Sequence, residues 1–147
     1  MQEYLEPADG TIARVEVLDG RYLYAIRIWA DRTGDFNLCP ADICQVPAAG
    51  IVTGAVNELA AAKKPMRIEP FDAPGDMIDA VLRIAREGRL DVGGVEYLVA
   101  ARDGLPYVYD VNALSNFVTD AVNVVGFDPH ARFARYLVDR ARVNVAA

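Results

Sequence analysis

The chain has 147 residues, of which 53% are hydrophobic. This length suits one domain that buries roughly 70% of the surface exposed by its unfolded form. The apolar content excludes intrinsic disorder, and no apolar run approaches the ~20 residues of a membrane-spanning helix. Fifteen Lys and Arg residues against 21 Asp and Glu residues give a net charge of -6, which argues against non-specific binding to nucleic-acid phosphates.

The N-terminal residues and the cysteine content indicate the compartment. Met1 is followed by Gln2-Glu3-Tyr4-Leu5, without the basic and apolar regions of a secretion signal. The two cysteines, Cys39 and Cys44, suit a reducing compartment. Their spacing, with His130 as the single histidine, favours neither a zinc site nor a Cys–His nucleophile. We therefore expect a cytoplasmic protein with no nucleic-acid partner and no membrane partner.

The apolar pattern predicts a β-hairpin near the N-terminus, with strands at 12–18 and 21–29 joined by a turn at Asp19-Gly20. An irregular segment spans 31–50, and its length indicates a functional or a mobile loop. There follow a helix at 52–64, a short strand at 66–69, a helix at 72–87, a second hairpin at 95–101 and 105–111, a short helix near 116–124 and a helix that begins at Asp128. These elements do not alternate as βαβ units. They therefore predict an α+β domain, in which helices pack on one face of an antiparallel sheet made of two hairpins and a short strand.

Strand parity in the first hairpin predicts which side chains share a face of the sheet. With a two-residue turn at Asp19-Gly20, Arg14 and Arg27 are diagonal neighbours, ~7–8 Å apart at the backbone. Two guanidinium groups on one face can bind a polyanion such as a nucleotide phosphate chain. The alternative is a pair of solvated arginines, one of them paired with Glu16. The opposite face is expected to pack on the helices and is wholly apolar: Ala13, Val15, Val17, Tyr22, Tyr24, Ile26 and Ile28.

The second hairpin allows two registers, and its apolar pattern decides between them. A two-residue turn at Asp103-Gly104 would put Glu96 on the opposite face from Asp110 and Asn112. A three-residue loop at 102–104 pairs Glu96 with Asp110 instead. We predict the second register, because it leaves the other face entirely apolar or aromatic: Val95, Tyr97, Val99, Ala101, Leu105, Tyr107, Tyr109 and Val111.

That register gathers Glu96, Asp110 and Asn112 at the open end of the hairpin. Two carboxylates and an amide oxygen are hard ligands, which suit Mg²⁺ held by one or two carboxylates while substrate phosphates complete its coordination. The alternative is an ordinary solvent-exposed face whose acidic side chains pair with nearby arginines. The pattern therefore predicts a candidate metal site without excluding a purely structural role.

At this point several segments, in their order and spacing, resemble the ATP-grasp fold. The run Gly93-Gly94-Val95-Glu96-Tyr97, followed by Tyr109-Asp110-Val111-Asn112-Ala113, is similar to the end of that fold, where an acidic residue and a later Glu/Asp-x-Asn hold magnesium ions. Gln2-Glu3-Tyr4-Leu5 looks like the hinge that lies against the adenine, and the hairpin of Arg14 is similar to the strands whose arginines face the phosphates. The resemblance covers about residues 2–140 and is strongest for the branch that includes the ribosomal-protein glutamate ligases.

The resemblance implies an enzyme that uses ATP to convert a carboxylate into an acyl phosphate, which an amine then attacks. In such a reaction, charge neutralisation by the metal ion and by arginine does most of the work. The implied partners are ATP with Mg²⁺ or Mn²⁺ and a small carboxylate or amine substrate. The implied site residues are Glu96, Asp110 and Asn112 for the metal, Arg14 and Arg27 for catalysis, and Gln2, Glu3, Leu5 and Arg14 for the nucleotide.

One part of the family pattern is missing. The family's first lobe supplies a lysine and a glycine-rich loop, and the chain has no G-x-x-x-x-G-K-[ST] or G-x-G-x-x-G run. The resemblance therefore implies that residues 1–147 form a single domain, the C-terminal metal-binding lobe, with the first lobe absent. A lone lobe leaves one side of the nucleotide in water, so we expect little or no catalysis by the chain alone.

Two further expectations concern the other surfaces. Residues 36–44 look similar to a segment of the related ligases, and we expect them to act on the acceptor substrate or as a lid. The alternative to a ligase lobe is a non-catalytic interaction or oligomerisation module derived from the same fold. Its sheet face, left bare by the missing lobe, would pair with a partner or with a second copy as a homodimer.

Overall fold

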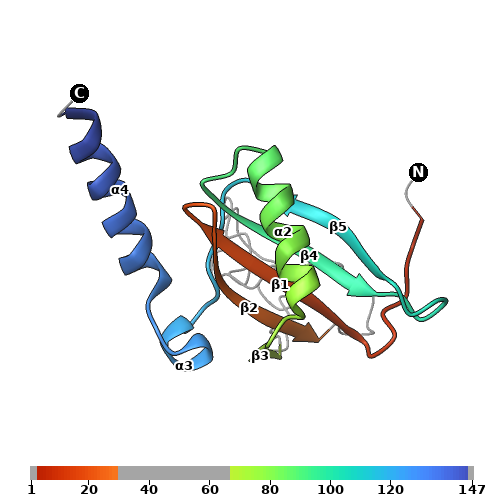
Figure 1. Cartoon of the computed structure of the whole chain (residues 1–147). Helices are drawn as coiled ribbons and strands as arrows, with labels where there is room; N and C mark the ends of the chain where they lie inside the picture. Colours follow the sequence, from red (N-terminus) through yellow and green to blue (C-terminus); the bar gives the residue numbers. More distant parts are fainter. Residues whose placement is uncertain (1–2, 30–66, 146–147) are drawn as a thin grey trace, which may run out of the picture.

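A computed structural model describes residues 3–29 and 67–145 (Figure 1). Its five strands form one antiparallel sheet in the order β3-β2-β1-β4-β5. They are β1 (Thr11–Leu18), β2 (Arg21–Trp29), β3 (Ile68–Pro70), β4 (Val92–Val99) and β5 (Pro106–Asn112). The helices are α2 (Gly75–Glu87), α3 (Ala121–Val125) and α4 (Pro129–Val145). The predicted α+β class is confirmed.

Some predictions concern residues that the structure does not describe. The helix at 52–64, the irregular segment at 31–50 with its proposed acceptor loop at 36–44, and Gln2 all lie outside the described residues. Within the described ranges, no helix is long and apolar enough to cross a membrane.

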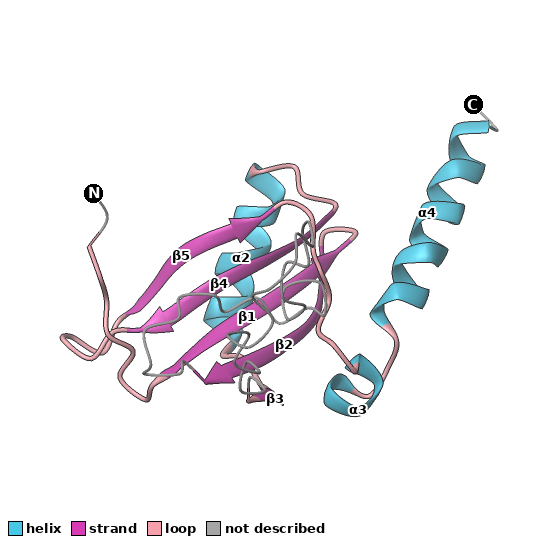
Figure 2. Cartoon of the chain, turned by 180° about the vertical axis from the view of Figure 1, so that it is seen from behind, coloured by secondary structure: helices cyan, strands magenta, loops and turns pink. Residues whose placement is uncertain are grey.

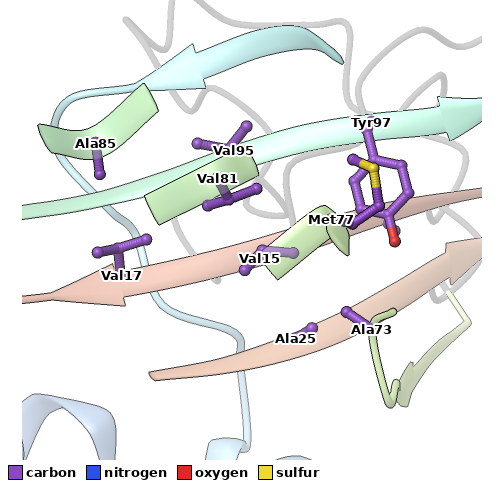
Figure 3. Packing of buried hydrophobic residues seen from close by; sticks show 10 residues of the cluster. Val15, Val17, Ala25, Ala73, Met77, Val81, Ala85, Val95 and Tyr97 are labelled. Carbon is purple, nitrogen blue, oxygen red and sulfur yellow. The ribbon is translucent and has the colours of Figure 1, made fainter. Parts of the chain in front are cut away.

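Helix α2 packs across one face of the sheet and makes the first of two apolar clusters. Its buried residues recur every four positions, at Met77, Val81 and Ala85, so they form one stripe along the helix. Figure 3 shows this stripe facing side chains of the central strands β1 and β4, including Val15 and Val95. The closely packed centre of the domain therefore lies between α2 and these two strands.

The second apolar cluster lies on the face opposite α2. This face is turned toward the viewer in Figure 2, where α2 lies behind the sheet. Phe117 and Val118, from the segment that leads into α3, and Ala121, the first residue of α3, pack there against side chains of β1, β2 and β4. Tyr24 ties this segment to the sheet, because its hydroxyl accepts a hydrogen bond of 3.1 Å from the Val118 amide. Helix α4 follows and stands beyond the edge of the sheet (Figure 1).

The first hairpin turns at Asp19-Gly20 as predicted, and both residues have positive φ angles, as a two-residue hairpin turn requires. The register then changes at a β-bulge. Glu16 pairs with Tyr24, which leaves Leu23 as an extra residue in β2. Because side chains alternate along a strand, this one residue moves all later side chains of β2 to the face opposite the predicted one.

The bulge separates the two arginines that were expected to share a face. Arg14 pairs with Ile26 on the face opposite α2, whereas Arg27 pairs with Ala13 on the face that α2 covers. There the guanidinium carbon of Arg27 lies 4.3 Å from the ring centroid of Phe71. The predicted convergence of Arg14 and Arg27 on one phosphate chain is therefore wrong, because the extra residue in β2 inverts its alternation.

The second hairpin has the predicted pairing at its open end but a different loop. Its loop has four residues, 101–104, rather than three, and a bulge at Tyr109 then restores the pairing of Glu96 with Asp110. Tyr107 and Tyr109 consequently lie with the second apolar cluster and not on the face predicted for them. Two compensating differences thus produce the predicted placement of the candidate metal ligands.

Candidate functional site

Three charged side chains are buried on the sheet face opposite α2. The exposed fractions of Arg14, Glu16 and Glu96 are 4%, 0% and 6%. Arg14 and Glu16 lie on one face of β1, and Glu96 is the residue of β4 that pairs directly with Arg14. Charged groups are rarely buried unless they are paired and hydrogen-bonded, and clusters of this kind concentrate at functional sites. This location is therefore the main candidate site.

Hydrogen bonds join these side chains into one group, which we call the Arg14 network. Arg14 Nε donates to Glu16 Oε1 at 2.6 Å, and Arg14 Nη1 donates to Glu96 Oε1 at 2.7 Å. The hydroxyl of Ser115 donates to Glu16 Oε2, and the hydroxyl of Tyr109 donates to Glu96 Oε2 at 2.9 Å. All four oxygens of the two carboxylates thus accept a hydrogen bond, which offsets part of the cost of their burial.

The charges of the network are not balanced, because two carboxylates surround one guanidinium group. Burial raises the pKa of Glu16 above its ordinary value, although the charge of Arg14 opposes the change. Burial works to lower the pKa of Arg14, but the charges and hydrogen bonds of Glu16 and Glu96 outweigh it and raise that pKa. Burial, reinforced by the charge of Glu96, also raises the pKa of Tyr109. Burial is thus the largest cause of the raised pKa values of Glu16 and Tyr109.

Asp110 and Asn112 lie beside the network at the open end of the second hairpin. Asp110 pairs with Glu96, and Asn112 pairs with Gly94, so the three predicted metal ligands lie on one face. Asp110 is exposed, and Asn112 Nδ2 donates to its Oδ2 at 2.7 Å. In the described ranges, no three His, Cys, Asp or Glu side chains gather closely enough to hold a metal ion. Two carboxylates with one amide oxygen nevertheless fit Mg²⁺, which takes only one or two protein carboxylates when phosphates complete its coordination.

The residues predicted to border the nucleotide lie at the other end of β4. The segment from Glu3 to Ala8 runs beside the loop of the second hairpin, and the Ala8 amide donates to the carbonyl oxygen of Val99 at 2.8 Å. Leu5 is half-buried against the second apolar cluster, whereas the exposed Glu3 forms an ion pair with Arg102. The structure thus brings Arg14 and Glu96 together, and leaves Glu3 and Leu5 apart from them, beside the other end of β4.

Sequence reasoning missed three members of the network. The sequence predicts Glu16 only as a partner of a solvated arginine, although its position two residues after Arg14 places both on one face of β1. Tyr109 reaches Glu96 only because of the bulge in β5. Ser115 reaches Glu16 from a loop 99 residues away in sequence, and no local sequence pattern predicts that contact.

No protein-family model and no curated protein matches the sequence. Solved structures of the ATP-grasp ligase PsnB do match the structure. PsnB complexed with a minimal precursor aligns at a TM-score of 0.60 and 22% identity, covering 95% of this chain and 37% of that chain. The chain therefore spans about a third of the length of the structures that it matches.

Two further PsnB complexes give the same result. The complex with a phosphomimetic precursor variant, Mg and ADP aligns at a TM-score of 0.60 and 22% identity, over 94% of this chain and 34% of that chain. The complex with precursor peptide PsnA2 and AMPPNP aligns at a TM-score of 0.56 and 20% identity, over 90% of this chain and 33% of that chain. The fold is that of part of an ATP-grasp ligase. At these identities the likeness establishes the fold alone.

Proposed function

We propose that the chain is the metal- and phosphate-binding part of an ATP-grasp carboxylate–amine ligase. The observation that carries the proposal is the buried Arg14–Glu96 ion pair, 2.7 Å between Nη1 and Oε1, with Asp110 paired directly opposite Glu96. The Arg14 network has two carboxylates for one guanidinium group, which supports a bound cation. The fold of the chain is similar to that of a ligase solved with Mg and ADP. The proposed lobe is the C-terminal one, as the order of the motifs implies.

In this proposal the side chains of the chain have separate tasks. Glu96, Asp110 and Asn112 hold Mg²⁺ or Mn²⁺, which neutralises phosphate charge when it is bound. Arg14 presents a planar guanidinium group to phosphate oxygens, a geometry that suits this residue better than lysine. Glu3 and Leu5 border the adenine and ribose. Arg27 has no part in the site, because it lies on the face covered by α2.

The substrates and the completed enzyme are also proposals. The reaction is the attack of an amine on an acyl phosphate, made from ATP and a small carboxylate. Since one of the PsnB structures contains a precursor peptide, a peptide side chain is one acceptor or donor class to be tested. A first lobe is required to exclude water from the nucleotide. Steady ATP turnover by the purified 147-residue chain alone would contradict this requirement.

Isothermal titration of ATP, with and without Mg²⁺, tests the proposed site. We expect metal-dependent binding that Asp110→Ala abolishes, because this substitution removes an exposed ligand without opening the buried network. Asp79→Ala is the matched control, since Asp79 is an exposed aspartate on α2, the helix that covers the other face. Binding that needs no metal ion, or that survives Asp110→Ala unchanged, would exclude the proposed ligand set.

A second candidate function, a non-catalytic interaction module, is favoured by one observation. Large apolar side chains are exposed in the C-terminal part of the chain, including Leu114 at 72% and Leu137 at 51%. Exposed apolar surface of this kind favours association. A size-exclusion column separates the two candidates: a stable dimer that is insensitive to Mg-ATP supports the module, whereas a monomer that binds Mg-ATP supports the ligase part.

A further inference from the structure

We infer that Glu16, Ser115 and Gly94 act together as a support that holds Arg14 in position for the phosphates. This inference rests on the proposed function, since it gives a reason for the fixed geometry of the arginine that we assign to the phosphates. Glu16 and Gly94 are buried, and the hydroxyl of Ser115 donates to Glu16. We therefore assign all three as positioning residues, which act on the nucleotide only through Arg14.

The first argument concerns Gly94. A Cβ atom added to this residue would lie 2.5 Å from Arg14 Nη2 and 2.8 Å from both Cζ and Nε. The guanidinium group therefore lies flat against the backbone of β4. The φ angle of Gly94 is not in the left-handed region, so an alanine would suit the backbone. Space for Arg14, and not backbone freedom, is the reason for glycine at this position.

The neighbouring glycine has a different reason. A Cβ atom added to Gly93 would lie 2.6 Å from the carbonyl oxygen of Asn112, which belongs to the backbone of β5. Gly93 therefore permits the close approach of two strands, whereas Gly94 permits the close approach of a side chain. Only a substitution at Gly94 changes the position of Arg14 directly.

The second argument concerns Glu16, which fixes the edge of the guanidinium group. Glu16 Oε1 accepts from Nε at 2.6 Å, while Glu96 accepts from Nη1 at 2.7 Å. Arg14 is thus held by two carboxylates along its edge and by Gly94 against its flat side. A flexible side chain fixed in this way loses its freedom on folding rather than on binding, which favours both affinity and catalysis.

The third argument concerns Ser115, which holds Glu16 in place by a hydrogen bond. Its hydroxyl donates to Glu16 Oε2, the oxygen that does not contact Arg14. Ser115 follows the proposed metal ligand Asn112 by three residues. The loop after β5 therefore links the metal end of the site to the carboxylate that orients the arginine.

The central test is Gly94→Ala, with Gly75→Ala as the control because a Cβ added to Gly75 meets nothing within 4 Å. The Nε–H of Arg14 is buried and bonded to Glu16, so we expect a slowly exchanging NMR signal, assigned by its absence in Arg14→Lys. Gly94→Ala should remove this signal and weaken Mg-ATP binding about tenfold. Gly75→Ala should retain both properties.

A double-mutant comparison distinguishes positioning from a general loss of structure. Lysine has no planar group to displace, so adding Gly94→Ala to Arg14→Lys should change the Mg-ATP dissociation constant by less than about twofold. A merely structural defect would weaken binding equally in both backgrounds, and that result would overturn the inference. Retention of the Arg14 signal and of wild-type affinity in Gly94→Ala would overturn it as well.

Two further outcomes are informative. If the wild-type chain shows the Arg14 signal, and Gly94→Ala removes it, but neither binds Mg-ATP, the support stands and the proposed function fails. If Gly94→Ala does not fold, Ser115→Ala replaces it: we expect faster exchange of the Arg14 signal and weaker binding, both restored by Ser115→Thr. An Arg14 signal that is unchanged in Ser115→Ala would then refute the support.

Discussion

Replacing Arg14 by methionine should destabilise the fold far more than the same replacement of Arg27. In Arg14→Met the bonds of 2.6 and 2.7 Å are lost, and Glu16 and Glu96 remain buried with no cation between them. Breaking a buried ion pair in this way costs about 3–5 kcal/mol. Arg27 is half-buried and contacts the ring of Phe71, an interaction that contributes about 0.5–1 kcal/mol.

Urea denaturation measures this difference directly. With a slope of about 2 kcal/mol per molar urea for a small domain, Arg14→Met should lower the unfolding midpoint by about 1.5–2.5 M. Arg27→Met should lower it by about 0.5 M or less. Failure of Arg14→Met to fold, while Arg27→Met folds normally, would agree with this ranking. Equal midpoints for the two variants would refute it, and would mean that the Arg14 network is hydrated in solution.

Two other predictions concern the core and the second hairpin. Val81→Ala should lower the free energy of unfolding by about 2 kcal/mol, because Val81 is fully buried between α2 and the sheet. Val122→Ala, at an exposed position, should change this free energy by less than about 0.5 kcal/mol. Equal losses for the two variants in urea denaturation would contradict the described packing. The amide of Leu105 and the hydroxyl of Tyr107 donate to Asp103 and lower the pKa of its carboxyl group below the ordinary 3.8. A lowered pKa in the folded state stabilises the fold above pH 3.8 and loses this effect as the pH falls through the lowered pKa. Asp103→Ala should therefore lower the melting temperature at neutral pH and have a smaller effect in acid, and an effect that grows in acid would contradict the contact.

The sequence was sufficient to predict the described strands and helices and the pairing of Glu96 with Asp110. That pairing was predicted from a clean apolar face that the structure does not have, and it holds because the bulge at Tyr109 offsets the longer loop. The face of Arg27 could not be predicted, because no second difference offsets the bulge in β2. After the bulge at Leu23, each side of β2 is largely apolar, so either side can pack against the helix. One side carries Tyr24, Ile26 and Ile28, and the other carries Ala25, Arg27 and Trp29. The choice depends on packing across the whole sheet.

The burial of the Arg14 network also could not be predicted from local sequence patterns. Glu16 is a charged residue in a strand, and by itself it suits a solvated edge as well as a buried position. Its burial depends on Arg14 beside it and on Ser115 from a distant loop. The two contacts bring together segments that no periodicity relates. Prediction of the chemistry therefore required the tertiary structure, whereas prediction of the fold did not.

The bulge at Leu23 has a consequence for insertions and deletions in this hairpin. Loss of one residue between the turn and Ile26 would be absorbed by loss of the bulge, which would leave Ile26 opposite Arg14 and in the apolar cluster. Loss of a second residue would exchange the two sides of the rest of β2, which would put Arg27 beside Arg14. A single deletion in this part of β2 should thus be tolerated better than a double deletion.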